Sequence, residues 1–184
     1  YNEYFASSSN KENLSFVIEI AKKFNVKKSN LIKTINSFKG LKYRQQIIFK
    51  KKDLSIINDS KSTSYSSTIE MLKNNNSIYW LIGGIPKKGD KFNLSRRFFR
   101  NIRGYIFGVN QKKFISDLKD KIKIKNFSTL DKALEELFKD IKIDKSIKKT
   151  ILFSPAAASF DLFKNFEFRG QYFNKIVKRY IHVR

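Results

Sequence analysis

The sequence predicts an α/β fold in which a doubly wound, mostly parallel sheet carries helices on both faces and follows a short helical segment. Apolar runs typical of strands alternate with amphipathic helical stretches after residue 41. Short connections between them favour parallel strands with right-handed crossovers. The hydrophobic period changes at Gly40, which divides the chain into residues 1–40 and 41–184. Residues 151–170 then read as strand, small-residue turn and helix.

Residues 1–40 are predicted to form two helices. The first covers about residues 11–24, where apolar residues recur at helical spacing: Leu14, Val17, Ile18, Ala21 and Phe24. Ser29 is the expected N-cap of the second helix, and Gly40 is expected to end it.

The remaining elements follow in order. Two runs rich in β-branched residues, 46–51 and 54–58, predict a hairpin. Further strands are expected at residues 78–82, 105–109, 122–127 and 151–153. The clearest helix covers about residues 130–141, with an apolar face formed by Leu130, Leu134, Leu137, Phe138 and Ile141.

The stretch ILFSPAAASFDLFKNFEFRG, residues 151–170, is the centre of the functional interpretation. Pro155 stops the strand because proline cannot donate to a ladder. Asp161 is expected to open a helix that carries Phe163, Phe166 and Phe173. Unpaired N–H groups at a helix start favour an anion, so Ser159 would lie where a carboxylate binds. An ordinary strand-to-helix turn explains the same residues equally well.

Composition limits the possible functions. A formal net charge of +23 and a pI near 10.1 are typical of nucleic-acid-binding proteins, and Arg96, Arg97, Arg100 and Arg103 form one candidate patch. The basic residues are otherwise mostly scattered lysines, so no specific nucleic acid is expected.

The absence of cysteine and the single His182 argue against a thiolate metal site or a histidine-based triad. No apolar run approaches the roughly 20 residues of a membrane span, so we expect a cytoplasmic protein without a membrane partner.

Two further loops carry candidate ligand-binding residues. INDSKSTSYSST, residues 57–68, places Asp59, Lys61 and Thr63 just after a strand end, although it could be only a capped turn. GGIPKKGD, residues 83–90, has a GxxxxG frame followed by Asp90, so it is not a Walker A loop. Its lysine pair could be simply solvated.

These strings resemble one enzyme family. SPAAASFDLFKNFEFRG is similar to the SPACASxDxFxNFExRG signature of the MurD family, the D-glutamate-adding Mur ligases of peptidoglycan synthesis. Residues 58–64 resemble its NDSKATN segment, residues 82–90 its LGGxxKxxDF loop, residues 40–44 its GLPHR linker and residues 9–13 its HNxxN helix start. By this resemblance residues 1–40 are the end of the central domain, and residues 41–184 are the Rossmann-like C-terminal domain.

The resemblance also implies roles for individual residues. Those matching D-glutamate-binding positions are Thr63, Lys87 (with Lys88 as the nearby alternative), Ser159 and Phe166. Those matching nucleotide-binding positions are Asn10, Asn13, Arg44, Asp59 and Lys61. The pattern departs from the family at Ser9, Lys42, Tyr43 and Ser64, where the family has His, Pro, His and Asn, so those contacts are not carried over.

The implied reaction is ATP-dependent joining of D-glutamate to UDP-N-acetylmuramoyl-L-alanine through an acyl phosphate, with Mg²⁺ as cofactor, in a monomeric enzyme. The family's P-loop GTxGK[ST] and its metal ligands are not found in these residues. We therefore expect a segment of a longer protein, without catalytic residues or a metal site, that is inactive alone. A domain of another Mur or folylpolyglutamate-type ligase remains the alternative, and the amino acid consumed would discriminate them.

Overall fold

The computed structural model describes residues 2–6, 8–73 and 76–181; His182 lies outside them. The chain divides into two compact units, Tyr1–Leu41 and Lys42–Arg184. Each unit has its own packing, so each is described separately.

The N-terminal unit consists of the 3₁₀ helix η1 (Glu3–Ala6) and the helices α1 (Ser8–Lys23) and α2 (Lys28–Ser37). The two predicted helices are present. The expected cap at Ser29 is wrong, because α2 begins at Lys28 and Ser29 lies inside the helix. This helix ends at Ser37, before Gly40, and the ring of Phe38 packs edge-on against Tyr4 at 5.1 Å.

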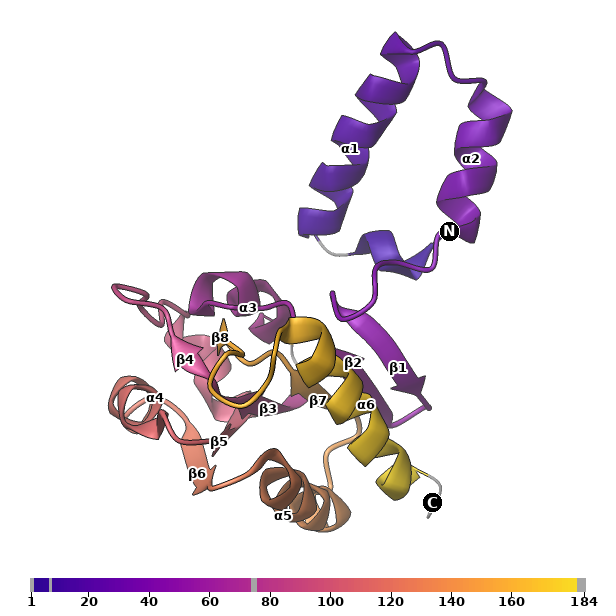
Figure 1. Ribbon diagram of the computed structural model, residues 1–184. Helices are drawn as coiled ribbons and strands as arrows, with labels where there is room; N and C mark the ends of the chain where they lie inside the picture. The colour runs from indigo at the N-terminus through magenta and orange to yellow at the C-terminus, as the bar shows by residue number, and fades with distance from the viewer. Residues whose placement is uncertain (1, 7, 74–75, 182–184) are drawn as a thin grey trace. The chain divides into compact units, whose positions relative to one another are not determined.

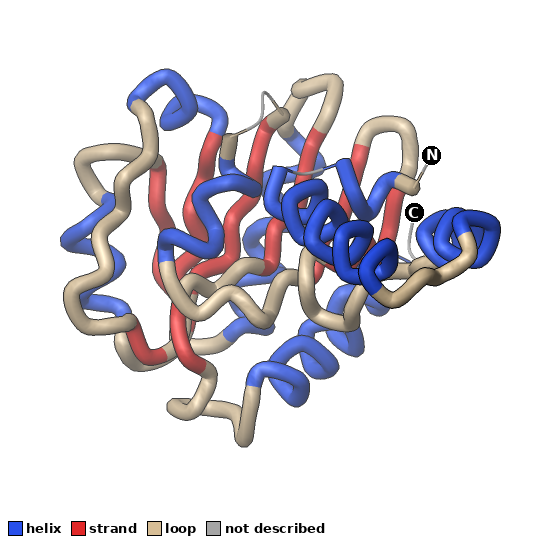
Figure 2. Tube along the Cα trace, turned by 90° about the horizontal axis from the view of Figure 1, so that it is seen from above, coloured by secondary structure: helices blue, strands red, loops and turns tan. Residues whose placement is uncertain are grey.

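The second unit is built on a six-stranded sheet with the order β1-β2-β7-β3-β5-β6. Its strands are β1 (Gln46–Lys50), β2 (Leu54–Asn58), β3 (Ser77–Ile82), β5 (Ile102–Phe107), β6 (Lys123–Phe127) and β7 (Lys149–Phe153). The hairpin β1–β2 is antiparallel and every other neighbouring pair is parallel. The strands lie side by side in Figure 2. The predicted doubly wound, mostly parallel sheet is confirmed.

Helices cover both faces of this sheet (Figure 1). One face carries α5 (Leu130–Ile143) and α6 (Phe166–Ile181), whose apolar side chains form a core with alternate residues of the strands. The other carries α3 (Tyr65–Leu72), α4 (Gln111–Leu118) and the 3₁₀ helix η2 (Arg96–Asn101), packed around the fully buried Trp80. Alternation of side chains across the strands therefore fills two separate cores.

The structure corrects two predicted boundaries. β5 ends at Phe107 and not at residue 109, because Gly108 turns the chain with a φ of +92°. No helix starts at Asp161. The chain first turns back at Ser159, whose carbonyl accepts from the N–H of Phe163 at 2.9 Å. α6 begins at Phe166, where the side chain of Asn165 caps it by accepting from the N–H of Phe168 at 2.9 Å.

Candidate functional site

Three loops meet where the central strands end. The loop after β2 begins at Asp59, whose N–H donates to the carbonyl of Phe153 at the end of β7, at 2.7 Å. The loop after β3 begins at Gly83, whose N–H donates to the carbonyl of Pro155 at 3.2 Å. The carboxyl edge of a parallel sheet is the usual ligand-binding position in open α/β folds. All three loops singled out in the sequence therefore lie at one edge.

Two short strands join the loop after β3 to the small-residue stretch. β4 (Ile85–Pro86) pairs antiparallel with β8 (Ala157–Ala158). The register pairs Ile85 with Ala158 and Pro86 with Ala157, so the two segments run side by side, with Lys87 following one end of the pair and Ser159 the other. Lys87 is exposed. Ser159 is 3% exposed, and its hydroxyl makes no hydrogen bond with any residue that the structure describes.

The expected anion site at a helix start beside Ser159 is wrong. The helix begins seven residues later, at Phe166. Ser159 therefore does not precede the free N–H groups of a helix start, contrary to the expectation from the sequence. What surrounds this serine is instead the β4–β8 pair and the turn that closes on its own carbonyl. Six residues therefore separate Ser159 from the start of α6, and this serine is not part of the first turn of a helix.

Arg169 is the residue that sequence reasoning missed. It is 1% exposed and links the loops: Nη2 donates to the carbonyl of Ser60 at 2.7 Å, Nε to the Ser60 hydroxyl at 3.2 Å, and Nη1 to the carbonyl of Gly83 at 3.3 Å. Burial lowers the pKa of Arg169 to about 10, opposed by the charges of Asp161 and Asp59. It therefore remains charged at neutral pH. The one sequence signal for Arg169 is that it matches the arginine of the SPACASxDxFxNFExRG signature.

Asp59 is buried and both of its oxygens are engaged within the protein. Oδ2 accepts from the hydroxyl of Ser154 at 2.8 Å, and Oδ1 accepts from the N–H of Gln45 at 3.1 Å. Burial raises the pKa of Asp59 from 3.8 to about 6, against the lowering effect of these bonds and of Arg44 and Arg169. The carboxylate therefore holds the segment around Arg44 against the strand ends.

Lys61 and Phe166 are brought together. The ammonium group of Lys61 lies 4.1 Å from the centre of the Phe166 ring, and the hydroxyl of Ser60 donates to the Phe166 carbonyl at 2.8 Å. Thr63 is exposed in the same loop. The Phe166 ring therefore restrains the ammonium group of Lys61 by a cation–π contact, while the Lys61 side chain stays partly exposed.

The start of α3 does not present a vacant anion site. A carboxylate oxygen of Asp90 accepts from the N–H of Tyr65 at 2.5 Å, and Ser64 forms a reciprocal capping box with Ser67. The serine that departs from the family pattern therefore has a structural task as the N-cap. Asp90 also ties the loop that contains Lys87 to the loop that contains Thr63.

The other nucleotide candidates lie in two places. Arg44 is exposed, next to Tyr43, whose ring packs against Gly170: a Cβ on that glycine would stand 2.4 Å from the ring. Asn10 and Asn13 belong to the N-terminal unit, where both line a mainly apolar pocket of about 360 Å³. The side chain of Asn10 also donates to the carbonyl of Tyr4 at 2.7 Å.

The described part of the chain, residues 2–6, 8–73 and 76–181, holds neither a candidate metal-binding cluster nor a candidate membrane-spanning helix. Among those residues, His, Cys, Asp and Glu side chains form no group of three or more that could hold a metal ion. No helix within the described ranges is long and apolar enough to span a membrane.

Comparison with curated proteins identifies relatives that cover nearly the whole chain. The UDP-N-acetylmuramoylalanine–D-glutamate ligase of Rickettsia felis is 32% identical over 180 residues, 98% of this chain. The ligases of the same name from the Wolbachia of Brugia malayi and from Agrobacterium fabrum are 34% and 33% identical over 94% and 90% of it. The chain is homologous to the C-terminal part of MurD ligases. It spans 40%, 34% and 35% of the lengths of these three MurD relatives.

Solved structures agree on the fold. MurF from Acinetobacter baumannii superposes with a TM-score of 0.65 over 93% of this chain and 38% of its own. MurC from Thermotoga maritima gives 0.64 over 97% and 39%. Both are 17% identical to the chain, so they establish the Mur-ligase fold and not the substrate. No protein-family model matches the chain.

Proposed function

We propose that this chain supplies the D-glutamate-binding and part of the nucleotide-binding surface of an ATP-dependent ligase that joins D-glutamate to UDP-N-acetylmuramoyl-L-alanine in the cytoplasm. The observation that carries the proposal is the β4–β8 pair, which joins the loop that carries Lys87 to the stretch that carries Ser159 at the carboxyl edge of the sheet. The MurD homology supports the choice of amino acid.

The substrate's two carboxylates account for the kinds of residue at this edge. Lys87 supplies a positive charge, and Thr63 a hydroxyl, to the side-chain carboxylate. The hydroxyl of Ser159, which has no partner among the described residues, and the backbone near Phe166 receive the α-carboxylate. Charge-assisted hydrogen bonds to carboxylates are about twice as strong as neutral ones. Lys88 is the alternative cation, because it lies in the same exposed turn.

The contribution of these residues to the reaction is positioning. ATP phosphorylates the alanyl carboxylate of the UDP-sugar, the amine of D-glutamate attacks the acyl carbon, and phosphate leaves as the amide forms. With both carboxylates held, the amine is aimed at the acyl phosphate, and such orientation can contribute several kcal/mol to catalysis. None of the residues named here serves as a nucleophile.

Nucleotide binding would use the cations beside the same edge. Lys61, held on the Phe166 ring, and the exposed Arg44 would contact the nucleotide, while Asp59 positions Arg44 through Gln45. Asn10 and Asn13 are the nucleotide-binding candidates within the N-terminal unit, where they line its pocket. No GxxxxGK[ST] motif occurs in these 184 residues. We propose that the triphosphate and Mg²⁺ bind residues beyond this sequence.

The direct test uses a complete ligase that contains this chain. Purified enzyme is supplied with ATP, UDP-N-acetylmuramoyl-L-alanine and one radiolabelled amino acid at a time: D-glutamate, L-glutamate, L-alanine or meso-diaminopimelate. Product labelled from D-glutamate alone is expected. Preferential incorporation of another amino acid would transfer the chain to a different Mur-type ligase.

A further inference from the structure

A basic hollow lies beside the edge strand β6, away from the loops of the candidate site. It has a volume of about 820 Å³ and lies between η2, the turn after α4 and the first residues of β6. Its charged lining comprises five cations and one carboxylate: Arg96, Arg100, Lys119, Lys121, Lys123 and Asp120. Its apolar lining is formed by Phe99, Ile102, Ile122 and Ile124.

The cations of this hollow are not neutralised by the protein. Within the described residues none of the five forms an ion pair. Lys121 alone is held, by a hydrogen bond to the carbonyl of Asp117 at 2.7 Å. Both arginines are exposed on one short 3₁₀ helix, so their guanidinium groups remain available to a ligand.

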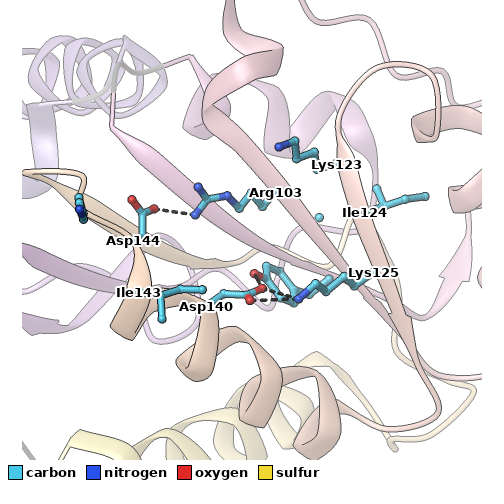
Figure 3. A pocket seen from close by; sticks show the side chains of 10 residues that line it. Arg103, Lys123, Ile124, Lys125, Asp140, Ile143 and Asp144 are labelled. Carbon is cyan, nitrogen blue, oxygen red and sulfur yellow. Dashed lines mark hydrogen bonds and ion pairs between the residues drawn. The ribbon is translucent and has the colours of Figure 1, made fainter.

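A neighbouring hollow shows the opposite arrangement. It measures about 580 Å³ and shares Lys123 and Ile124 with the first. Here Arg103 pairs with Asp144 at 2.6 Å and Lys125 with Asp140 at 2.9 Å, while Lys123 stands apart from both pairs (Figure 3). The carboxylates of α5 and of the residue after it therefore neutralise Arg103 and Lys125, whereas the cations that line the first hollow form no ion pair among the described residues.

We propose that the hollow lined by Arg96 and Arg100 binds a ligand that carries phosphate groups. Guanidinium groups bind phosphate oxygens bidentately and are more weakly hydrated than ammonium groups, so two of them in one hollow favour this ligand over a lone carboxylate. The lysines at its rim add long-range attraction. The phosphate belongs either to a small soluble molecule or to the headgroup of an anionic lipid. The site is separate from the proposed ligase function.

Calorimetric titration of the 184-residue chain with inorganic pyrophosphate at about 0.1 M salt tests the proposal, since salt at this level screens interactions between distant exposed charges. Saturable binding is expected, and Arg96→Ala with Arg100→Ala should weaken it at least about tenfold through loss of the charge-assisted bonds. The control Arg97→Ala with Lys142→Ala removes the same charge from exposed residues outside the hollow and should weaken it less than about twofold. Thermal unfolding of all variants checks that the fold is retained.

Cosedimentation with phosphatidylglycerol and phosphatidylcholine vesicles distinguishes the two sources. Pyrophosphate binding that depends on the arginine pair supports a soluble ligand. Binding to the anionic vesicles alone, lost with the same pair, assigns the site to a lipid headgroup. The proposal is overturned if neither probe binds, or if the charge-matched control weakens binding as much as the arginine pair does.

Discussion

Gly84 lies so close to Ala158 that a Cβ added to Gly84 would stand 2.2 Å from the Ala158 carbonyl oxygen. Gly84 also has a φ of +127°, a backbone conformation that residues other than glycine rarely adopt. Pairing of β4 with β8 therefore requires glycine at position 84. That pair in turn joins the loop that carries Lys87 to the stretch that carries Ser159.

Gly84→Ala should destabilise the protein by at least about 3 kcal/mol, because strain and the clash with backbone act together. Gly89→Ala is the control: its φ is +76°, but nothing lies within 4 Å of the added carbon, so only strain of about 1 kcal/mol is expected. Urea unfolding of both variants measures the difference. Equal destabilisation would show that contact with Ala158 does not constrain the loop.

Arg169→Lys should cost about 2–4 kcal/mol of folding free energy, since one ammonium group cannot reach the carbonyls of both Ser60 and Gly83 and leaves a buried acceptor unpaired. Arg179→Lys, an exposed position on the same helix, should change stability by less than about 0.5 kcal/mol. Denaturant midpoints provide the comparison. A midpoint unchanged by Arg169→Lys would remove this arginine from its role as the link between loops.

Much of the fold followed from local pattern. Alternating strand and helix periods predicted the parallel sheet, and each of the three candidate loops was recognised as following a strand end. β4 and β8 were not predicted, because two-residue strands leave no periodicity. The helix start was misplaced at Asp161, because Asn165 is an equally good local cap and the turn at Ser159 decides between them.

The buried role of Arg169 was beyond the same reasoning for a different cause. Its partners Ser60 and Gly83 lie 109 and 86 residues away in sequence, so no spacing near Arg169 records them. Lys61 and Phe166 are likewise distant in the chain and adjacent in space. Such contacts form only when the sheet has assembled. In the sequence, Arg169 and Phe166 were distinguished only by their places in the SPAAASFDLFKNFEFRG string.

Asp59 should give the protein a measurable pH dependence. Its carboxyl is protonated in both states below about pH 4; between about pH 4 and 6 the unfolded chain ionises while the folded protein retains the proton. A raised pKa in the folded state therefore means that stability is lost as pH rises through this interval, by up to about 3 kcal/mol.

Asp59→Asn removes this titration and isolates it from the other carboxylates. The free energy of unfolding of the variant, minus that of the wild type, should increase between about pH 4 and pH 7 by up to about 3 kcal/mol. Urea unfolding across this range gives the difference. A constant difference would show that the carboxyl of Asp59 titrates normally in the folded protein.

The proposed role of Lys87 is to hold the side-chain carboxylate of D-glutamate. Its most direct test is steady-state kinetics of Lys87→Ala, Lys88→Ala and Lys91→Ala in a complete ligase containing this chain; all three lysines are exposed, so none should affect folding. Lys87→Ala should lower kcat/KM for D-glutamate by about tenfold to a hundredfold, because a charged hydrogen bond is lost. KM for ATP should stay within a few-fold of the wild-type value. Lys91→Ala should match the wild type. Unchanged D-glutamate kinetics in Lys87→Ala would show that Lys87 does not bind the substrate. A selective loss in Lys88→Ala instead would show that the neighbouring lysine binds it.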